Sequence, residues 1–77
     1  MINKINDNIE VNETENEIVI KCKEEPSNIV LLVNQMIMPY QYEDGACVYH
    51  IERDWIGDTS KAVLYRFSDL TLTHIEL

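Results

Sequence analysis

Apolar and polar residues alternate along much of this chain, and the alternation predicts β-strands. In residues 9–12 and 17–22 every second side chain is Ile, Val or Cys, with mostly polar residues between them. A strand points successive side chains to opposite faces of its sheet, so a period of two gives each strand one apolar face. The sequence therefore predicts one all-β domain over residues 1–77, a small antiparallel barrel or sandwich of about six strands built from hairpins.

The first predicted hairpin turns at residues 13–16. Pairing outward from this loop places apolar residues opposite one another on one face and mostly polar residues on the other, as a half-buried antiparallel pair requires. The predicted pairs are Val11 with Ile18, Ile9 with Ile20, Asp7 with Cys22, Glu10 with Val19, and Asn8 with Lys21.

Asp44 and Gly45 are the strongest turn signal, because glycine adopts positive φ without steric cost and Asp-Gly suits a type I′ turn. Pairing outward from this turn makes one face wholly apolar or aromatic. The predicted pairs on that face are Tyr42 with Cys47, Tyr40 with Tyr49, and Met38 with Ile51. Pro39 conflicts with this register because it has no N–H for the ladder, so we expect a bulge, an early end to the pairing or an edge strand there.

The third predicted hairpin joins residues 62–67 to residues 70–77 through Ser68 and Asp69. Its first face pairs Phe67 with Leu70, Tyr65 with Leu72, and Val63 with His74. Its second face pairs Arg66 with Thr71, Leu64 with Thr73, and Ala62 with Ile75. We expect the first face to point into the core. The second face is also rather apolar, which indicates partial cover or an interface.

Residues 26–38 fit either a strand or a helix. Five apolar residues recur at the spacing of a helix stripe: Ile29, Leu32, Val33, Met36 and Ile37. Pro26 suits a helix start, whereas the many β-branched residues that follow favour a strand. We expect a strand, and the alternative is an α+β fold with one short helix near residues 27–37.

The predicted core collects the inward side chains of these strands. It consists of Ile9, Val11, Ile18, Ile20, Cys22, Ile29, Leu31, Val33, Met38, Tyr40, Tyr49, Ile51, Val63, Tyr65, Phe67, Leu70 and Leu72. A chain of this length buries only about 60–65% of its unfolded surface. We therefore expect a partner or oligomer to add stability.

Charge and cysteine content narrow the partners and the compartment. Fourteen Asp and Glu against six Lys and Arg give a formal net charge of −8, which repels nucleic acid and anionic membranes and favours a basic protein partner. The longest apolar run, residues 29–33, is too short for a membrane span or a signal-peptide core. With Cys22 and Cys47 as the only cysteines, we expect free thiols and a cytoplasmic location. Abundant Ile and Asn indicate a low-GC bacterium or one of its phages.

Catalytic, cofactor and metal signatures are missing from the sequence. Cys47 and His50 have ligand-like spacing, but residues three apart on a strand point to opposite faces. Two glycines are too few for a phosphate-binding loop. Ser27, Ser60 and Ser68 all fall in predicted turns, without the His and acid that would activate them. We expect no enzyme activity, no cofactor and no metal.

Acidic side chains and one tryptophan form the candidate contact surface. Glu13, Glu15 and Glu17 would lie about 6.7 Å apart on an extended strand, and such a row could imitate a nucleic-acid backbone. The loop expected at residues 13–16 would break this row. The alternative is that the charges only keep the protein soluble. Trp55 lies in a predicted loop and either caps the core or anchors a partner. The candidate protein-binding residues are Glu13, Glu15, Glu17, Glu43, Asp44, Asp54, Trp55 and Asp58.

The sequence thus predicts a small acidic, non-catalytic protein that binds another protein. A more specific prediction is that the protein is a phage-type inhibitor or regulator of a host nucleic-acid-handling enzyme with a basic surface. The alternative is a structural or oligomer-forming subunit, such as a virion component. The second apolar face of the third hairpin, around Ala62, Leu64 and Ile75, and exposed strand edges favour that alternative.

Overall fold

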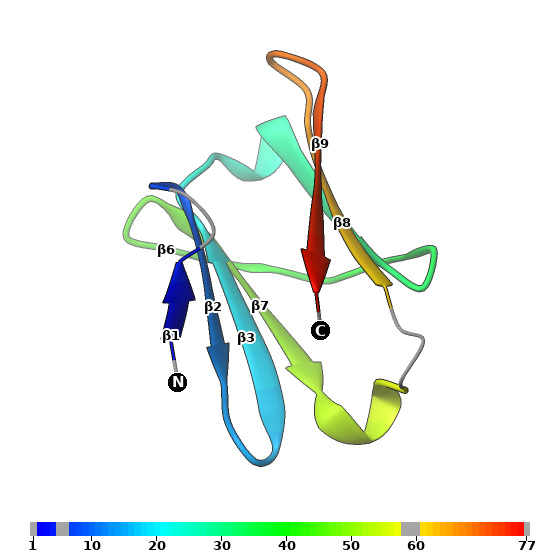
Figure 1. Cartoon of the computed structure of the whole chain (residues 1–77). Helices are drawn as coiled ribbons and strands as arrows, with labels where there is room; N and C mark the ends of the chain where they lie inside the picture. The colour runs from blue at the N-terminus through cyan, green and yellow to red at the C-terminus, as the bar shows by residue number, and fades with distance from the viewer. Residues whose placement is uncertain (1, 5–6, 58–60, 77) are drawn as a thin grey trace.

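Two antiparallel sheets build the fold in the computed structural model, which describes residues 2–4, 7–57 and 61–76 (Figure 1). The first sheet contains, in spatial order, β1 (Ile2–Lys4), β2 (Ile9–Glu13), β3 (Glu17–Cys22), β7 (Ala46–Glu52) and β6 (Gln41–Glu43). The second contains β5 (Met36–Ile37), β4 (Ile29–Val33), β8 (Lys61–Arg66) and β9 (Thr71–Glu76). Two 3-10 turns, η1 (Pro26–Asn28) and η2 (Arg53–Trp55), precede β4 and follow β7. The predicted all-β class is confirmed.

Of the two expected forms, barrel or sandwich, one is excluded, and the expected number of strands is wrong. The chain forms two separate antiparallel sheets instead of one closed barrel, so the expected sandwich is the form that agrees with the structure. The expected number of about six strands is too low, because β1 adds a strand and the expected strand arm before Asp44 divides into β5 and β6. These two short strands belong to different sheets. Pro39 lies between them, where its missing N–H helps to end the pairing.

Residues 29–33 are a strand, as the β-branched composition predicts, and the alternative of a helix near residues 27–37 is wrong. A tight turn at Asn34 and Gln35 then reverses the chain into β5, with Val33 opposite Met36. Both turn residues have positive φ, 51° and 68°. The sequence reading missed this hairpin, because asparagine accepts that conformation readily but glutamine rarely occupies it.

Replacing Gln35 with glycine is expected to stabilise the domain by about 0.5–1 kcal/mol. A glutamine at positive φ carries a steric cost that glycine does not, and Asn-Gly is the favoured sequence for a two-residue hairpin turn. Urea denaturation of the two proteins measures the difference. Asn34→Gly is the control that should bring no gain, because the Asn34 Oδ1 accepts a hydrogen bond from the Lys61 N–H at 3.1 Å. A loss of stability in Gln35→Gly would contradict this account of the turn.

The registers of two predicted hairpins agree with the structure, and the register of the other differs. The second hairpin pairs Tyr42 with Cys47 and the third pairs Ala62 with Ile75, as predicted. The first hairpin is displaced by two residues, so that Val11 lies opposite Ile20 instead of Ile18. Its turn is tighter than expected because Thr14 Oγ1 accepts a hydrogen bond from the Glu17 N–H and donates one to the Glu17 carbonyl, both at 3.1 Å. A displacement of two leaves every side chain on its predicted face.

The core lies between the two sheets and draws on both. It is made of Ile9, Val11, Ile18, Ile20, Cys22, Cys47, Tyr49 and Ile51 from the first sheet, and of Ile29, Leu31, Val33, Ala62, Leu64 and Ile75 from the second. Met38 is half-buried and packs against this cluster. Most of the predicted core of the first two hairpins and of β4 is therefore confirmed.

The third hairpin turns the opposite face inward. Ala62, Leu64 and Ile75 are buried, although we expected them on the far face. Five residues predicted for the core are exposed instead, and Val63 is half-buried on the outer face. The exposed five are Tyr40, Tyr65, Phe67, Leu70 and Leu72. Tyr40 is exposed because the chain leaves the first sheet before reaching Tyr49. Tyr65 and Leu72 lie on the face of β8 and β9 that is turned away from the first sheet, and Phe67 and Leu70 lie in the turn between those strands.

Candidate functional site

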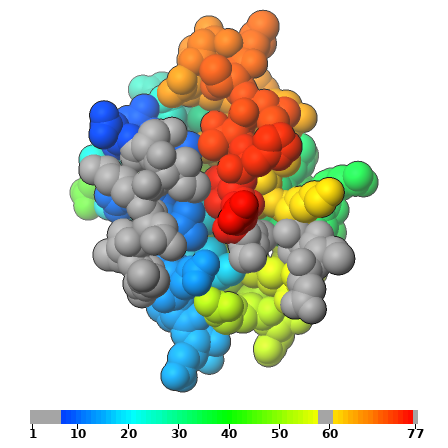
Figure 2. Space-filling model, viewed as in Figure 1, coloured from blue at the N-terminus to red at the C-terminus, as the bar shows by residue number. Residues whose placement is uncertain are grey.

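Two surfaces are candidates for function, and the first is an acidic end of the molecule. It is formed by the β2–β3 turn and by η2, which lie side by side at the bottom of Figure 2. Glu13 ends β2, Glu15 lies in the turn and Glu17 begins β3. The turn breaks the extended row of carboxylates that would have imitated a nucleic-acid backbone. The three acids instead occupy the two strand ends and the turn of one hairpin tip.

Arg53 joins the two parts of this acidic end. Its backbone N–H donates to the Asn16 carbonyl at 3.0 Å, and its Nε donates to the Thr14 carbonyl. Its Nη2 lies 3.4 Å from Glu13 Oε2. Because the pair is largely exposed, its main consequence is geometric: it fixes η2 against the hairpin tip and offsets one of the negative charges.

Trp55 projects from η2 with 41% of its surface exposed. The next residue, Ile56, turns inward and packs against the core, and its N–H closes the turn on the Arg53 carbonyl at 3.0 Å. This alternation holds the indole outward beside Asp54, which is itself exposed. Five of the eight predicted contact residues therefore meet at one end: Glu13, Glu15, Glu17, Asp54 and Trp55.

The remaining predicted contact residues do not join them. Glu43 ends β6 and Asp44 begins the tight turn into β7, so both lie at the far end of β7 from η2 (Figure 1). Asp44 and Gly45 have φ of 50° and 78°, as expected for a type I′ turn. Asp58 lies outside the described residues.

The second candidate surface is the outer face of the four-stranded sheet, and the sequence predicted that its β8 and β9 residues Val63, Tyr65 and Leu72 belong to the core. One row across this face runs from Ile37 through Leu32 and Val63 to His74, and the next runs from Val30 through Tyr65 to Leu72. Ile37, Tyr65 and Leu72 are 73%, 38% and 44% exposed. The sequence does contain one indication of this surface: both faces of residues 62–75 are apolar. Alternation of apolar and polar residues therefore does not predict which of the two faces is buried.

The outer face of the five-stranded sheet is different in character. Its rows are mostly polar, and four of its side chains are carboxylates: Glu10, Glu17, Glu43 and Glu52. Lys21 and His50 share this face, and the Nδ1 of His50 lies 3.3 Å from Glu17 Oε2. The outer face of the five-stranded sheet is thus polar, whereas the outer face of the four-stranded sheet presents apolar side chains to solvent.

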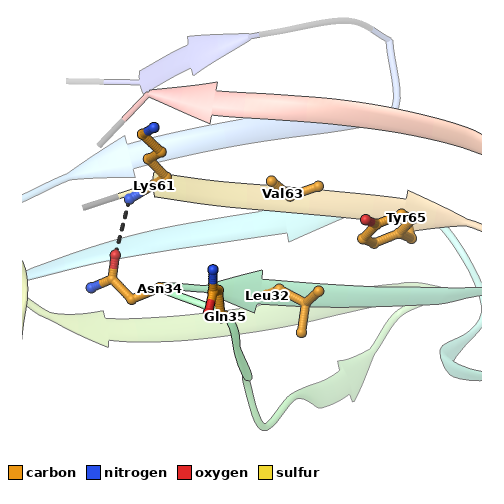
Figure 3. A pocket seen from close by; sticks show the side chains of 6 residues that line it. All are labelled: Leu32, Asn34, Gln35, Lys61, Val63 and Tyr65. Carbon is orange, nitrogen blue, oxygen red and sulfur yellow. Dashed lines mark hydrogen bonds between the residues drawn. The ribbon is translucent and has the colours of Figure 1, made fainter. Parts of the chain in front are cut away.

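A shallow hollow of about 450 Å³ opens on the apolar face (Figure 3). Leu32, Val63 and Tyr65 form its apolar floor. Asn34, Gln35 and Lys61 line its polar side, where the Asn34 side chain holds the first residue of β8. A hollow open to solvent with an apolar floor suits a protruding side chain of another protein better than it suits an enclosed small molecule.

The residues that could support chemistry are buried or scattered. Cys22 and Cys47 lie opposite each other on β3 and β7, both buried and both free thiols. Burial, with the negative charge of Glu24 adding to it, raises the pKa of the Cys22 thiol to about 11 and also raises the pKa of Cys47. Neither is therefore a thiolate near neutral pH. The described residues contain no group of three or more His, Cys, Asp or Glu side chains that could hold a metal ion.

One of the hollows lined by residues of both sheets is small. A hollow near the start of β9 has a volume of about 120 Å³, well below the roughly 300 Å³ at which small-molecule sites begin. Arg66 lies at this hollow with Nη1 3.4 Å from Glu24 Oε1, and it also pairs with Asp69. Its charge is thus already matched. Within the described part of the chain, no helix has the length and apolar character needed to cross a membrane.

Comparison of the chain with protein-family models, with curated proteins and with solved structures finds no significant match.

Proposed function

We propose that this chain is a small non-catalytic domain that acts by binding protein. The observation that carries the proposal is the contrast between its two outer sheet faces: one polar and acidic, the other built from Val30, Leu32, Val63, Tyr65 and Leu72. Apolar side chains held in a contiguous exposed patch gain free energy when another surface covers them. The buried Cys22 and Cys47 thiols, which their raised pKa values keep protonated, favour binding over chemistry.

Site-directed photocross-linking tests this proposal. A photoreactive phenylalanine analogue at position 65 should give protein adducts, identified by mass spectrometry, in a lysate of a low-GC bacterium. The same analogue at His50, on the polar sheet, is the matched control and should give far fewer. Equal or absent adducts at the two positions would contradict binding through the apolar face.

The acidic end favours a second candidate function, the inhibition or regulation of a basic nucleic-acid-handling enzyme. The supporting observation is that exposed Trp55 and Asp54 lie on η2, which Arg53 joins to the hairpin tip that carries the three glutamates. Charge would speed the encounter, and the indole would supply contact area in the complex.

Charge reversal separates this second function from the first. The probe is a panel of basic DNA-binding proteins at 50 and 500 mM salt. Glu13→Lys/Glu15→Lys should abolish binding, and the control Glu43→Lys/Asp44→Lys, with the same change in net charge at the other end of β7, should retain most of it. Binding that ignores salt, or that both variants lose equally, would exclude the acidic end as the contact.

A further inference from the structure

The apolar face has the right chemistry to meet a copy of itself. Among the described residues, the outward side chains of β4, β8 and β9 include two formal charges, Lys61 and Glu76, which lie opposite each other on β8 and β9. Their signs cancel, although the whole chain carries −8. Two copies can therefore approach through this face without bringing like charges together, and their acidic sheets and turns stay on the outside.

A basic partner would gain little from this face, because the face offers no net negative charge. A second copy fits it in two further ways. A two-fold axis makes an interface self-complementary, so Lys61 of one copy can approach Glu76 of the other. The hollow above Leu32, Val63 and Tyr65 of one copy can also receive an exposed side chain from the same face of the other copy, such as Leu72.

The area of the face limits the size of such a contact. Strands about 4.8 Å apart and up to six residues long give the sheet a face of roughly 300–400 Å². This matches the size of patches that mark interaction sites and is about half of the roughly 800 Å² per partner in a standard interface. Exposed Ile37 and Phe67 border the face and extend it. We expect a reversible dimer with a dissociation constant in the micromolar range.

Sheet geometry favours this arrangement as well. Two sheets with the same right-handed twist pack face to face with their strands within about 30° of each other. Two copies of one sheet necessarily have the same twist. We propose that the outer face of the four-stranded sheet is covered by a second copy of this chain, in a two-fold dimer that packs β4–β8–β9 against β4–β8–β9. This inference rests on the proposed binding function and names the partner on the same face.

Sedimentation analysis of the full chain from 1 to 500 µM, at 50 and 500 mM salt, tests the dimer. The mass should rise with concentration from 9.0 kDa towards twice that value. Higher salt should strengthen the association, because it screens the repulsion between two chains of charge −8 and leaves the apolar contact in place. A chain that stays monomeric to 500 µM, or a dimer that salt weakens, would overturn the inference.

Two valines provide a matched pair of variants. Val63 and Val19 are both half-buried on middle strands, but Val63 belongs to the apolar face and Val19 lies between Asn12 and His50 on the polar sheet. Val63→Asp should raise the dimer dissociation constant at least 30-fold, and Val19→Asp should leave it within about threefold. Circular dichroism checks the fold. If Val63→Asp unfolds, Leu72→Asp on the exposed edge strand β9 replaces it.

The outcomes also separate this inference from the proposed function. Equal dimerisation of the two variants would place the contact elsewhere and refute the second copy as occupant. Adducts from position 65 to other proteins, from a chain that remains monomeric, would refute the dimer and support protein binding. Adducts at twice the chain mass would support both.

Discussion

Replacing Leu31 with alanine is expected to lower the free energy of unfolding by about 3–5 kcal/mol. Leu31 is fully buried at the centre of the second sheet's inner face, and its loss removes transfer free energy and leaves a cavity. A domain of this size has roughly 5–10 kcal/mol in total, so the variant should be close to unfolding. Urea denaturation followed by circular dichroism measures the change.

Leu32→Ala is the matched control, because the neighbouring leucine points to the opposite face and is half-buried there. We expect it to cost less than about 1.5 kcal/mol when measured at a few micromolar, where the proposed dimer is largely dissociated. Similar losses in the two variants would mean that the inner and outer faces of β4 are wrongly assigned.

Raising the pH above 9 is expected to destabilise the domain progressively. Burial raises the pKa of Cys22 from 9.0 to about 11, and burial also raises the pKa of Tyr49 above its usual value near 10. Between pH 9 and 11 the unfolded chain loses the thiol proton that the folded chain retains, so the unfolded state binds fewer protons and stability falls as pH rises. Each group contributes up to about 1.4 kcal/mol per pH unit, which gives about 2–3 kcal/mol for Cys22 by pH 11 and a further loss from Tyr49 above pH 10.

Unfolding midpoints in urea at pH 8, 9, 10 and 11 measure this effect. The control is the double variant Cys22→Ala/Tyr49→Phe, which removes two of the three buried ionisable groups with raised pKa values and keeps the Cys47 thiol. It is less stable at pH 8, but its stability should change much less between pH 9 and 11. The same slope in the variant and the unchanged chain would assign the alkaline loss to other groups.

The candidate contact residues show how a site can be predicted in part. The sequence pointed to acidic residues and one tryptophan as contact residues, and the fold brings five of them to one end of the molecule. The sequence also pointed to Glu43 and Asp44, which lie at the far end of β7. Residues at a turn are easy to recognise, because turn chemistry is local, but which turns share an end depends on the strand order. That order follows from pairing between distant segments, such as β3 with β7.

For the β8–β9 hairpin, the sequence predicted the wrong inward face. Tyr65 and Leu72 are paired as predicted, yet they point to solvent instead of the core. Both faces of this hairpin are apolar, and hydrophobicity therefore gives no preference between them. Contact with the first sheet separates them: Ala62, Leu64 and Ile75 pack into the core, and the aromatic ring of Tyr65 remains outside.

Alternation and turn chemistry by themselves determined the β class, the strands of the three expected hairpins, two of their three registers and the inward side of β2, β3, β4 and β7. These properties depend on neighbours along the chain or across one turn, where a period of two and a glycine at positive φ have direct physical consequences. Packing between the sheets decided the rest. It divided residues 36–43 between two sheets, selected the buried face of the third hairpin and left the opposite face exposed, because only the space between facing sheets determines which of two apolar surfaces fits.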